Sequence, residues 1–125
     1  MAQTPSPIPL ISIGRLRDVS AKLGQSLTPQ FTFSGIIDFD NYSPQTGRVL
    51  LSTLNPYPAG VIVGGGISRE VQLEVENVVK EHNAAGRYNL KFVCIPMGIR
   101  DRLEPAEVHE WIKDALSKEF GGVSW

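Results

Sequence analysis

Apolar residues along the chain fall into four short runs, and after each run they return at about every third or fourth position. The runs cover 10–13, 31–39, 60–63 and 90–95. Short runs rich in β-branched residues are typical of strands buried on both faces, whereas the wider spacing is typical of helices packed on a sheet. The pattern therefore predicts four strand-then-helix units.

The helices predicted after these strands have apolar faces, and two of them carry recognisable start signals. Val19, Leu23 and Leu27 share one helical face, and 49–54 forms a second, compact apolar helix. Ser68 is suited to cap the third helix, and Pro105 fits the first turn of the fourth. Each predicted helix thus has an apolar face with which to cover the sheet.

The order of the elements predicts the fold class, α/β. Four strand-then-helix units in succession favour three layers, with a four-stranded parallel sheet, right-handed crossovers and helices on both faces. We expect a Rossmann-like or flavodoxin-like arrangement with strand order 2-1-3-4. The 125 residues suffice for one such domain, which we place at 10–125 behind a disordered, proline-rich lead-in at 1–9.

Charge and composition exclude several classes of partner. A net charge of −1 with mixed signs gives no electrostatic preference for nucleic acid or for an anionic membrane. No apolar stretch approaches the roughly 20 residues of a membrane-spanning helix, and the start lacks the features of a secretory signal. The single cysteine, Cys94, has apolar neighbours and is expected to be a buried thiol. These features predict a soluble, cytoplasmic protein.

The predicted strand order also locates a candidate ligand site. Open parallel sheets bind ligands beyond the carboxyl ends of their strands, where the strand order reverses, and here the first and third strands meet. Glycines let main-chain N–H groups approach a phosphate or carboxylate closely, and arginines pair with such anions. A tight glycine turn beside solvated arginines is the alternative interpretation. The predicted ligand-binding residues are Gly14, Arg15, Gly64, Gly65, Gly66, Ser68 and Arg100.

Catalytic and metal-binding chemistry has little support in the sequence. Asp38 and Asp40 follow the second strand and are the least implausible general bases, although acidic loops are also ordinary turns. His82 and His109 flank apolar stripes and are expected on the surface, and 100–102 is expected to be a mobile flap or a charged loop. No spacing indicates a metal site, so we expect none. Whether the protein is an enzyme stays open.

The segment 61–68 resembles the opening of a dinucleotide-binding fingerprint, G-x-G-x-x-G. Arg69 takes the place of its third glycine, and the next strand ends in Cys94-Ile95-Pro96 with no acidic residue to hold a ribose hydroxyl. We therefore do not expect a full dinucleotide site, and the cofactor stays unassigned.

Two functions fit these features. The first is a small-molecule-binding domain, with or without enzymatic activity, that holds an anionic ligand at the exits of the first and third strands. The second is a non-catalytic interaction module that forms a homodimer through apolar surface around Tyr57 or through the end containing Val123 and Trp125. Loss of ligand binding in Arg15→Ala would favour the first, and loss of association on removal of Trp125 the second.

Ile13-Gly14-Arg15, the entry to the second strand at Pro29 and the glycine-rich stretch 61–66 together resemble a group of small fungal proteins with a Rossmann-like fold. The resemblance covers roughly residues 10–120. It implies a compact one-domain protein of the fungal cytosol that is an accessory to small-molecule metabolism. It brings no catalytic residues with it, since a fold does not determine a function.

Overall fold

The structure is a computed structural model that describes residues 7–14, 17–38, 42–53, 58–64, 66–85, 89–96, 98–121, 123 and 125. Strands and helices alternate along the chain, as predicted. The elements are β1 (Ile8–Gly14), α1 (Arg17–Leu27), β2 (Phe31–Asp38), α2 (Pro44–Thr53), β3 (Gly60–Val63), α3 (Arg69–Ala84), β4 (Lys91–Cys94), α4 (Ile99–Arg102) and α5 (Pro105–Phe120).

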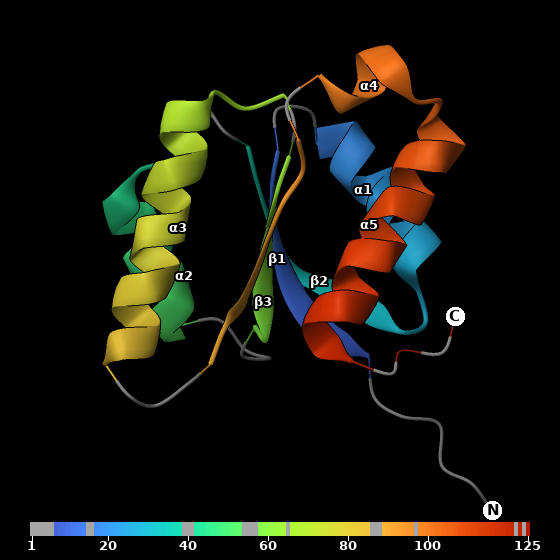
Figure 1. Ribbon diagram of the computed structural model, residues 1–125. Coiled ribbons are helices and arrows are strands. Elements are labelled where there is room, and N and C mark those ends of the chain that lie inside the picture. The colour runs from blue at the N-terminus through green and yellow to red at the C-terminus, as the bar shows by residue number, and fades with distance from the viewer. Residues whose placement is uncertain are drawn as a thin grey trace, which may run out of the picture.

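The four strands form one parallel sheet in the order β2-β1-β3-β4, which confirms the predicted topology (Figure 1). β1 pairs with both β2 and β3, and β4 extends the sheet beyond β3. Near the carboxyl ends, Ile13 lies opposite Val63, which in turn lies opposite Cys94. The exits of β1 and β3 therefore lie side by side, where the direction of winding reverses.

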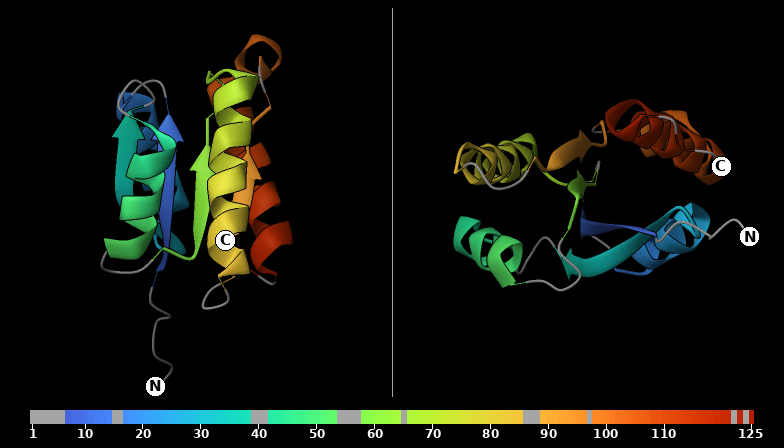
Figure 2. Two further views of the ribbon diagram at one scale, coloured as in Figure 1. Left: turned by 90° about the vertical axis from the view of Figure 1, so that its left-hand side faces the viewer. Right: turned by 90° about the horizontal axis from the view of Figure 1, so that it is seen from below.

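Helices cover both faces of the sheet, giving the three layers of a Rossmann-like or flavodoxin-like fold. α1 and α5 lie on one face and α2 and α3 on the other (Figure 2). Alternate strand residues enter the two cores: Leu10 and Ile62 pack on the α1 and α5 side, and Ile11 and Val61 on the α2 and α3 side. Of the helices in the described part of the chain, none has the length and apolar character needed to cross a membrane.

The boundaries differ from the prediction at three places. β1 includes Ile8 and Pro9, which we had placed in the disordered lead-in; Ile8 donates to Gln30 O at 2.9 Å, and the Pro9 carbonyl accepts from Ala59 N at 2.7 Å. A proline near the start of a strand is tolerated because its carbonyl still pairs. α2 begins at Pro44, earlier than predicted, because proline fits a first helical turn. The segment predicted as a flap or charged loop lies within the short helix α4, and Gly98, which precedes that helix, has a left-handed conformation.

Candidate functional site

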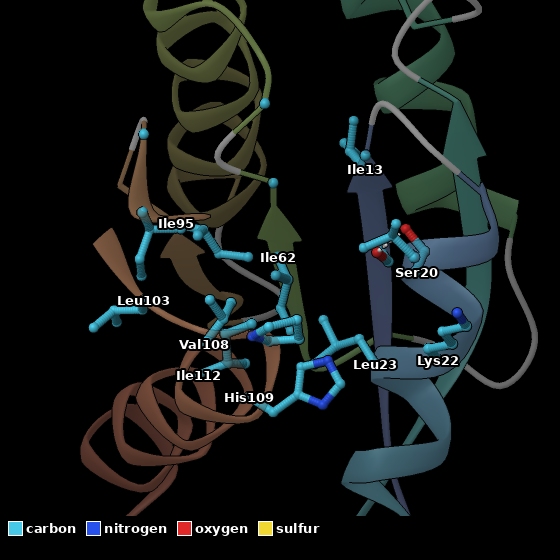
Figure 3. A pocket seen from close by; sticks show the side chains of 18 residues that line it. Ile13, Ser20, Lys22, Leu23, Ile62, Ile95, Leu103, Val108, His109 and Ile112 are labelled. Atoms are coloured by element: carbon cyan, nitrogen blue, oxygen red, sulfur yellow. Dashed lines mark hydrogen bonds between the residues drawn. The ribbon is translucent and has the colours of Figure 1, made fainter. Parts of the chain in front are cut away.

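A cavity of about 660 Å³ lies on the α1 and α5 side of the sheet, at the carboxyl ends of β1 and β3 (Figure 3). Its volume is in the range of small-molecule sites. Its walls are formed by α1 and α5, and Ile62 of β3 contributes to the sheet side. The glycines that line it come from three strand exits and are Gly14, Gly64, Gly66 and Gly98.

The sequence of β1 explains why a cavity forms at this end of the sheet. Successive side chains of a strand alternate between its faces, so Leu10, Ser12 and Gly14 all face α1 and α5. Their side chains shrink from leucine to serine to glycine toward the carboxyl end. The amino end of this face is filled by large core residues such as Leu27 and Phe31, which are fully buried. On this face, the described carboxyl end of β1 has no comparable side chain, and space is left between the helices.

A buried hydroxyl pair lies in the cavity wall. Ser12 Oγ donates to Ser20 Oγ across 3.2 Å, and the two residues are only 3% and 5% exposed. A Cβ atom at Gly14 would lie 2.8 Å from Ser20 Oγ, so a larger residue at this position would force the Ser20 side chain, α1 or β1 to shift. This pair was not predicted, although Ser12 is the only polar residue in the predicted strand 10–13.

Two side chains that can carry positive charge line the cavity from opposite helices. Lys22 comes from α1 and is exposed, and His109 comes from α5 and is half-buried (Figure 3). Within the residues that the structure describes, Lys22 makes no ion pair. His109 is partly exposed and lies next to Val108 and three residues before Ile112, at the edge of the buried face of α5.

The predicted glycines lie at the cavity, but Gly64 does not offer its amide to a ligand. Gly14, Gly64 and Gly66 line the cavity as expected. The N–H of Gly64 donates to Ile13 O at 2.8 Å, so the sheet already uses it. The predicted cradle of amides would therefore have to be formed without Gly64. Gly65 lies outside the described residues.

The structure describes only one of the predicted polar ligand contacts in full. Ser68 is exposed, does not line the cavity, and accepts from Val71 N at 3.4 Å as the N-cap of α3. Its hydroxyl therefore stabilises the helix and not a ligand at this cavity. Arg15 lies outside the described residues, and so does the side chain of Arg100, although its main chain belongs to α4.

A buried glutamine fixes the geometry of the strand exits. Gln72 of α3 is 2% exposed, and its Nε2 donates to Gly64 O at 3.1 Å and to Ile95 O at 3.2 Å. It thereby joins the exits of β3 and β4, both of which border the cavity. This role was not predicted, but Gln72 stands three residues before Val75, on the face that packs against the sheet.

The predicted catalytic carboxylates are not brought into the cavity. Asp38 ends β2, is half-buried and is absent from the described lining, and Asp40 lies outside the described residues. Among the lining residues that the structure describes, Lys22 and His109 are the ionisable side chains. In the described residues, no three His, Cys, Asp or Glu side chains gather as a metal site would require.

Cys94 lies on the α3 face of β4, whereas the cavity lies on the α1 and α5 face. Its side chain is partly exposed and not fully buried as expected. Arg69 Nη1 is 3.7 Å from Cys94 Sγ. Burial raises the pKa of the Cys94 thiol, and the Arg69 charge opposes that increase. A thiol with a raised pKa is not an activated nucleophile.

The carboxyl-terminal residues predicted to dock on a partner pack on their own domain. The Trp125 ring stacks on Phe31 with 5.4 Å between centroids, and its Nε1 donates to Ser117 Oγ at 2.7 Å. Val123 packs against the same core. These contacts account for both residues without a partner. Tyr57 lies outside the described residues, and the homodimer stays a prediction.

No family model, curated protein or solved structure matches the chain. The class of protein is thus defined by its fold and its cavity: an α/β domain with a parallel sheet in the order 2-1-3-4 and a cavity at the switch point. What the cavity holds must be argued from the side chains that line it.

Proposed function

We propose that the protein is a small-molecule-binding domain whose ligand is an anion held beyond the carboxyl ends of β1 and β3. The observation that carries this proposal is the position of the 660 Å³ cavity at the reversal of strand order. Open α/β sheets bind their ligands at this place because the loops from neighbouring strands diverge there and leave a crevice.

The charges around the cavity favour an anion. Lys22 and His109 line it, and no Asp or Glu side chain does so among the described residues. A carboxylate or phosphate inside would meet a cation without an opposing carboxylate. Arg15 and Arg100, the predicted ligand contacts, would add to this preference. Binding needs no catalytic group, so the proposal holds for an accessory enzyme of cytoplasmic metabolism and for a binding protein alike.

A thermal-shift screen tests the proposal. Purified protein is heated with nucleotides, flavins, phosphosugars, acyl-CoAs and organic acids, because a ligand that binds only the folded state raises the midpoint. At a ligand concentration of about 100 times the Kd the added stability is about 2.7 kcal/mol, which such a scan resolves. A midpoint raised by one anionic class is the expected result. If no class raises the midpoint, the proposal is wrong.

A pair of variants tests the location of the site. Val19 lines the cavity and is half-buried, so Val19→Trp should fill part of the space and abolish the shift. Val49 on α2 is 53% exposed and lies on the opposite face, so Val49→Trp should leave the shift unchanged. A ligand that binds both variants equally would lie elsewhere, and that result would overturn the assignment of this cavity.

A further inference from the structure

We propose that the ligand is an aliphatic carboxylate whose chain lies between α1 and α5 and whose carboxylate pairs with Lys22 and His109. This inference rests on the proposed function and specifies its ligand class. It comes from three properties of the cavity: the chemistry of its walls, the position of its two basic side chains, and the state of its buried hydroxyls.

The walls favour an aliphatic ligand body. Leu23 of α1 and Val108 and Ile112 of α5 extend into the space between the two helices (Figure 3). No Phe, Tyr or Trp side chain lines the cavity among the described residues. Nucleobases and other planar ligands are commonly held by stacking on aromatic rings, and a ribose by a carboxylate. Neither kind of group lines this cavity in the part that the structure describes, whereas an alkyl chain needs only aliphatic contacts.

The two basic side chains favour a carboxylate as the polar group. Lys22 lines the cavity from α1 and His109 lines it from α5, and Lys22 has no ion pair with any described residue. The Lys22 ammonium group carries three N–H donors, which suit the two oxygens of a carboxylate. A phosphate presents three acceptor oxygens and more charge. Two of the groups predicted to hold a phosphate are already occupied, since the Gly64 amide pairs with β1 and the Ser68 hydroxyl caps α3.

The buried hydroxyls do not demand a polar ligand at the inner end. Ser12 and Ser20 bond to each other across 3.2 Å. An alkyl chain beside them leaves this hydrogen bond intact, so the chain causes no unsatisfied polar group of the kind that costs stability. The inner wall of the cavity is therefore compatible with the apolar end of the ligand. The carboxylate end of the ligand then lies at Lys22 and His109.

Isothermal titration of the full chain with hexanoate, octanoate and decanoate tests the ligand class. Burial of each methylene should tighten the Kd about fourfold until the cavity is full. 1-Decanol, which has the chain without the charge, should bind more weakly than decanoate. Equal Kd values along the acid series, or equal binding of 1-decanol and decanoate, would overturn the inference.

Paired variants test the position of the carboxylate. Lys22→Gln and His109→Gln should each weaken decanoate binding by about three- to tenfold while the gain per methylene is kept. Lys80→Gln and His82→Gln are the matched controls, because both residues lie on α3 across the sheet, and each should leave the Kd unchanged. Lys22 is exposed, so its variant is expected to fold, which far-ultraviolet circular dichroism checks.

The outcomes separate this inference from the proposed function. If Arg15→Ala abolishes decanoate binding and the Lys22 and His109 variants bind as the wild type does, the carboxylate lies at the strand exits. The position proposed here is then wrong, and the proposed function stands. The same holds if the thermal-shift screen finds a phosphosugar or nucleotide and the fatty acids do not bind. If no anion of any class binds, both are wrong.

Discussion

The side-chain nitrogen of Gln72 lies 3.1 Å from the carbonyl oxygen of Gly64 and joins helix α3 to the exit of β3. A second bond, 3.2 Å long, joins the same nitrogen to the carbonyl oxygen of Ile95 beyond β4. Main-chain carbonyls past the end of a strand pair need donors when they are buried, and Gln72 makes the shorter hydrogen bond to each of these two. The exits of β3 and β4 form one edge of the cavity. A side chain from α3, on the opposite face of the sheet, thus fixes the position of this edge.

Gln72→Leu should destabilise the protein, because the leucine keeps the volume but removes the shorter hydrogen bond to each carbonyl. Only Ile67 N at 3.4 Å would then remain for Gly64 O, and Cys94 Sγ at 3.9 Å for Ile95 O. The free energy of unfolding should fall by about 1–3 kcal/mol, the cost of buried unsatisfied groups. Urea denaturation measures it. Gln45 on α2 is exposed, so Gln45→Leu should have little effect. Equal stability of Gln72→Leu and wild type would show that the two carbonyls find other donors.

The fold was predictable because its signals are local. The spacing of apolar residues in α3 and α5, and the unbroken apolar run at 60–63, depend only on neighbours in the sequence. Helix α4 was missed because four residues are too few for a periodic pattern. The topology followed from the succession of strands and helices, since crossover rules leave few arrangements.

The site was predictable only in its location. The switch-point rule placed Gly14 and Gly64 at the cavity, because strand exits follow from the topology. The roles of Gln72 and His109 depend on which distant segments they meet, and those contacts join residues far apart in the chain. Gln72 donates to Ile95 O, 23 positions away in the sequence, and no periodic pattern of apolar residues predicts such a hydrogen bond.

Gly14→Ala should destabilise the protein through a clash with Ser20. The new Cβ would lie 2.8 Å from Ser20 Oγ, which forces the Ser20 side chain, α1 or β1 to shift. Overpacking of this kind costs about 1–3 kcal/mol. The cost should shrink in a Ser20→Ala background, because the double variant removes the clashing oxygen, and a double-mutant cycle in urea measures the coupling.

Gly64→Ala is the control for the double-mutant cycle of Gly14 and Ser20, because a Cβ at position 64 causes no clash. At Gly64, a Cβ would be 3.5 Å from its nearest neighbour, Ile13 O, which is ordinary contact. Gly64→Ala should therefore change the free energy of unfolding by less than about 1 kcal/mol. If Gly14→Ala and Gly64→Ala changed the free energy of unfolding equally, contact with Ser20 would not be the reason for glycine at position 14.

Trp125→Ala should lower stability without changing the size of the particle in solution. The variant loses stacking on Phe31, the hydrogen bond to Ser117 and the contact with the Lys113 ammonium group, which is 5.5 Å from the ring centroid. Because the ring is 43% exposed, we expect a loss of about 1–2 kcal/mol. Urea denaturation measures the loss, and sedimentation velocity tests association. A wild-type dimer that dissociates in this variant would instead assign Trp125 to an interface.

Alkylation of Cys94 should be slow at neutral pH and slower still in Arg69→Gln. Burial raises the pKa of the thiol, and the Arg69 charge and hydrogen bond lower it. Removal of Arg69 should raise that pKa further and shift the pH profile of iodoacetamide labelling to higher pH. Arg48 pairs with Glu81 on the surface of α2 and α3, so Arg48→Gln should leave the profile unchanged. A shift to lower pH in Arg69→Gln would contradict this account of the thiol.

Tyr42 should make the protein sensitive to alkali. Burial and then the negative charge of Glu74 raise the pKa of its phenol from 10.0 to about 12, and Arg48 partly opposes them. A folded-state pKa above the unfolded value means that its contribution to stability is complete below pH 10 and is lost as the pH rises toward 12. The urea midpoint of the wild type should therefore fall more steeply across this range than that of Tyr42→Phe.

Two further measurements isolate the phenol from other groups that titrate in alkali. The chain has three tyrosines, so the tyrosinate absorbance of the wild type minus that of Tyr42→Phe reports on Tyr42. In Glu74→Gln the midpoint of this difference should move down toward 10, because a charge that raises the pKa is gone.

Within the described residues the buried hydroxyl of Tyr42 has no hydrogen-bond partner, so Tyr42→Phe should lower the free energy of unfolding only slightly at neutral pH. A large loss there would mean that the hydroxyl is bonded, and a difference titration centred on 10 would mean that Tyr42 is solvated in the folded protein.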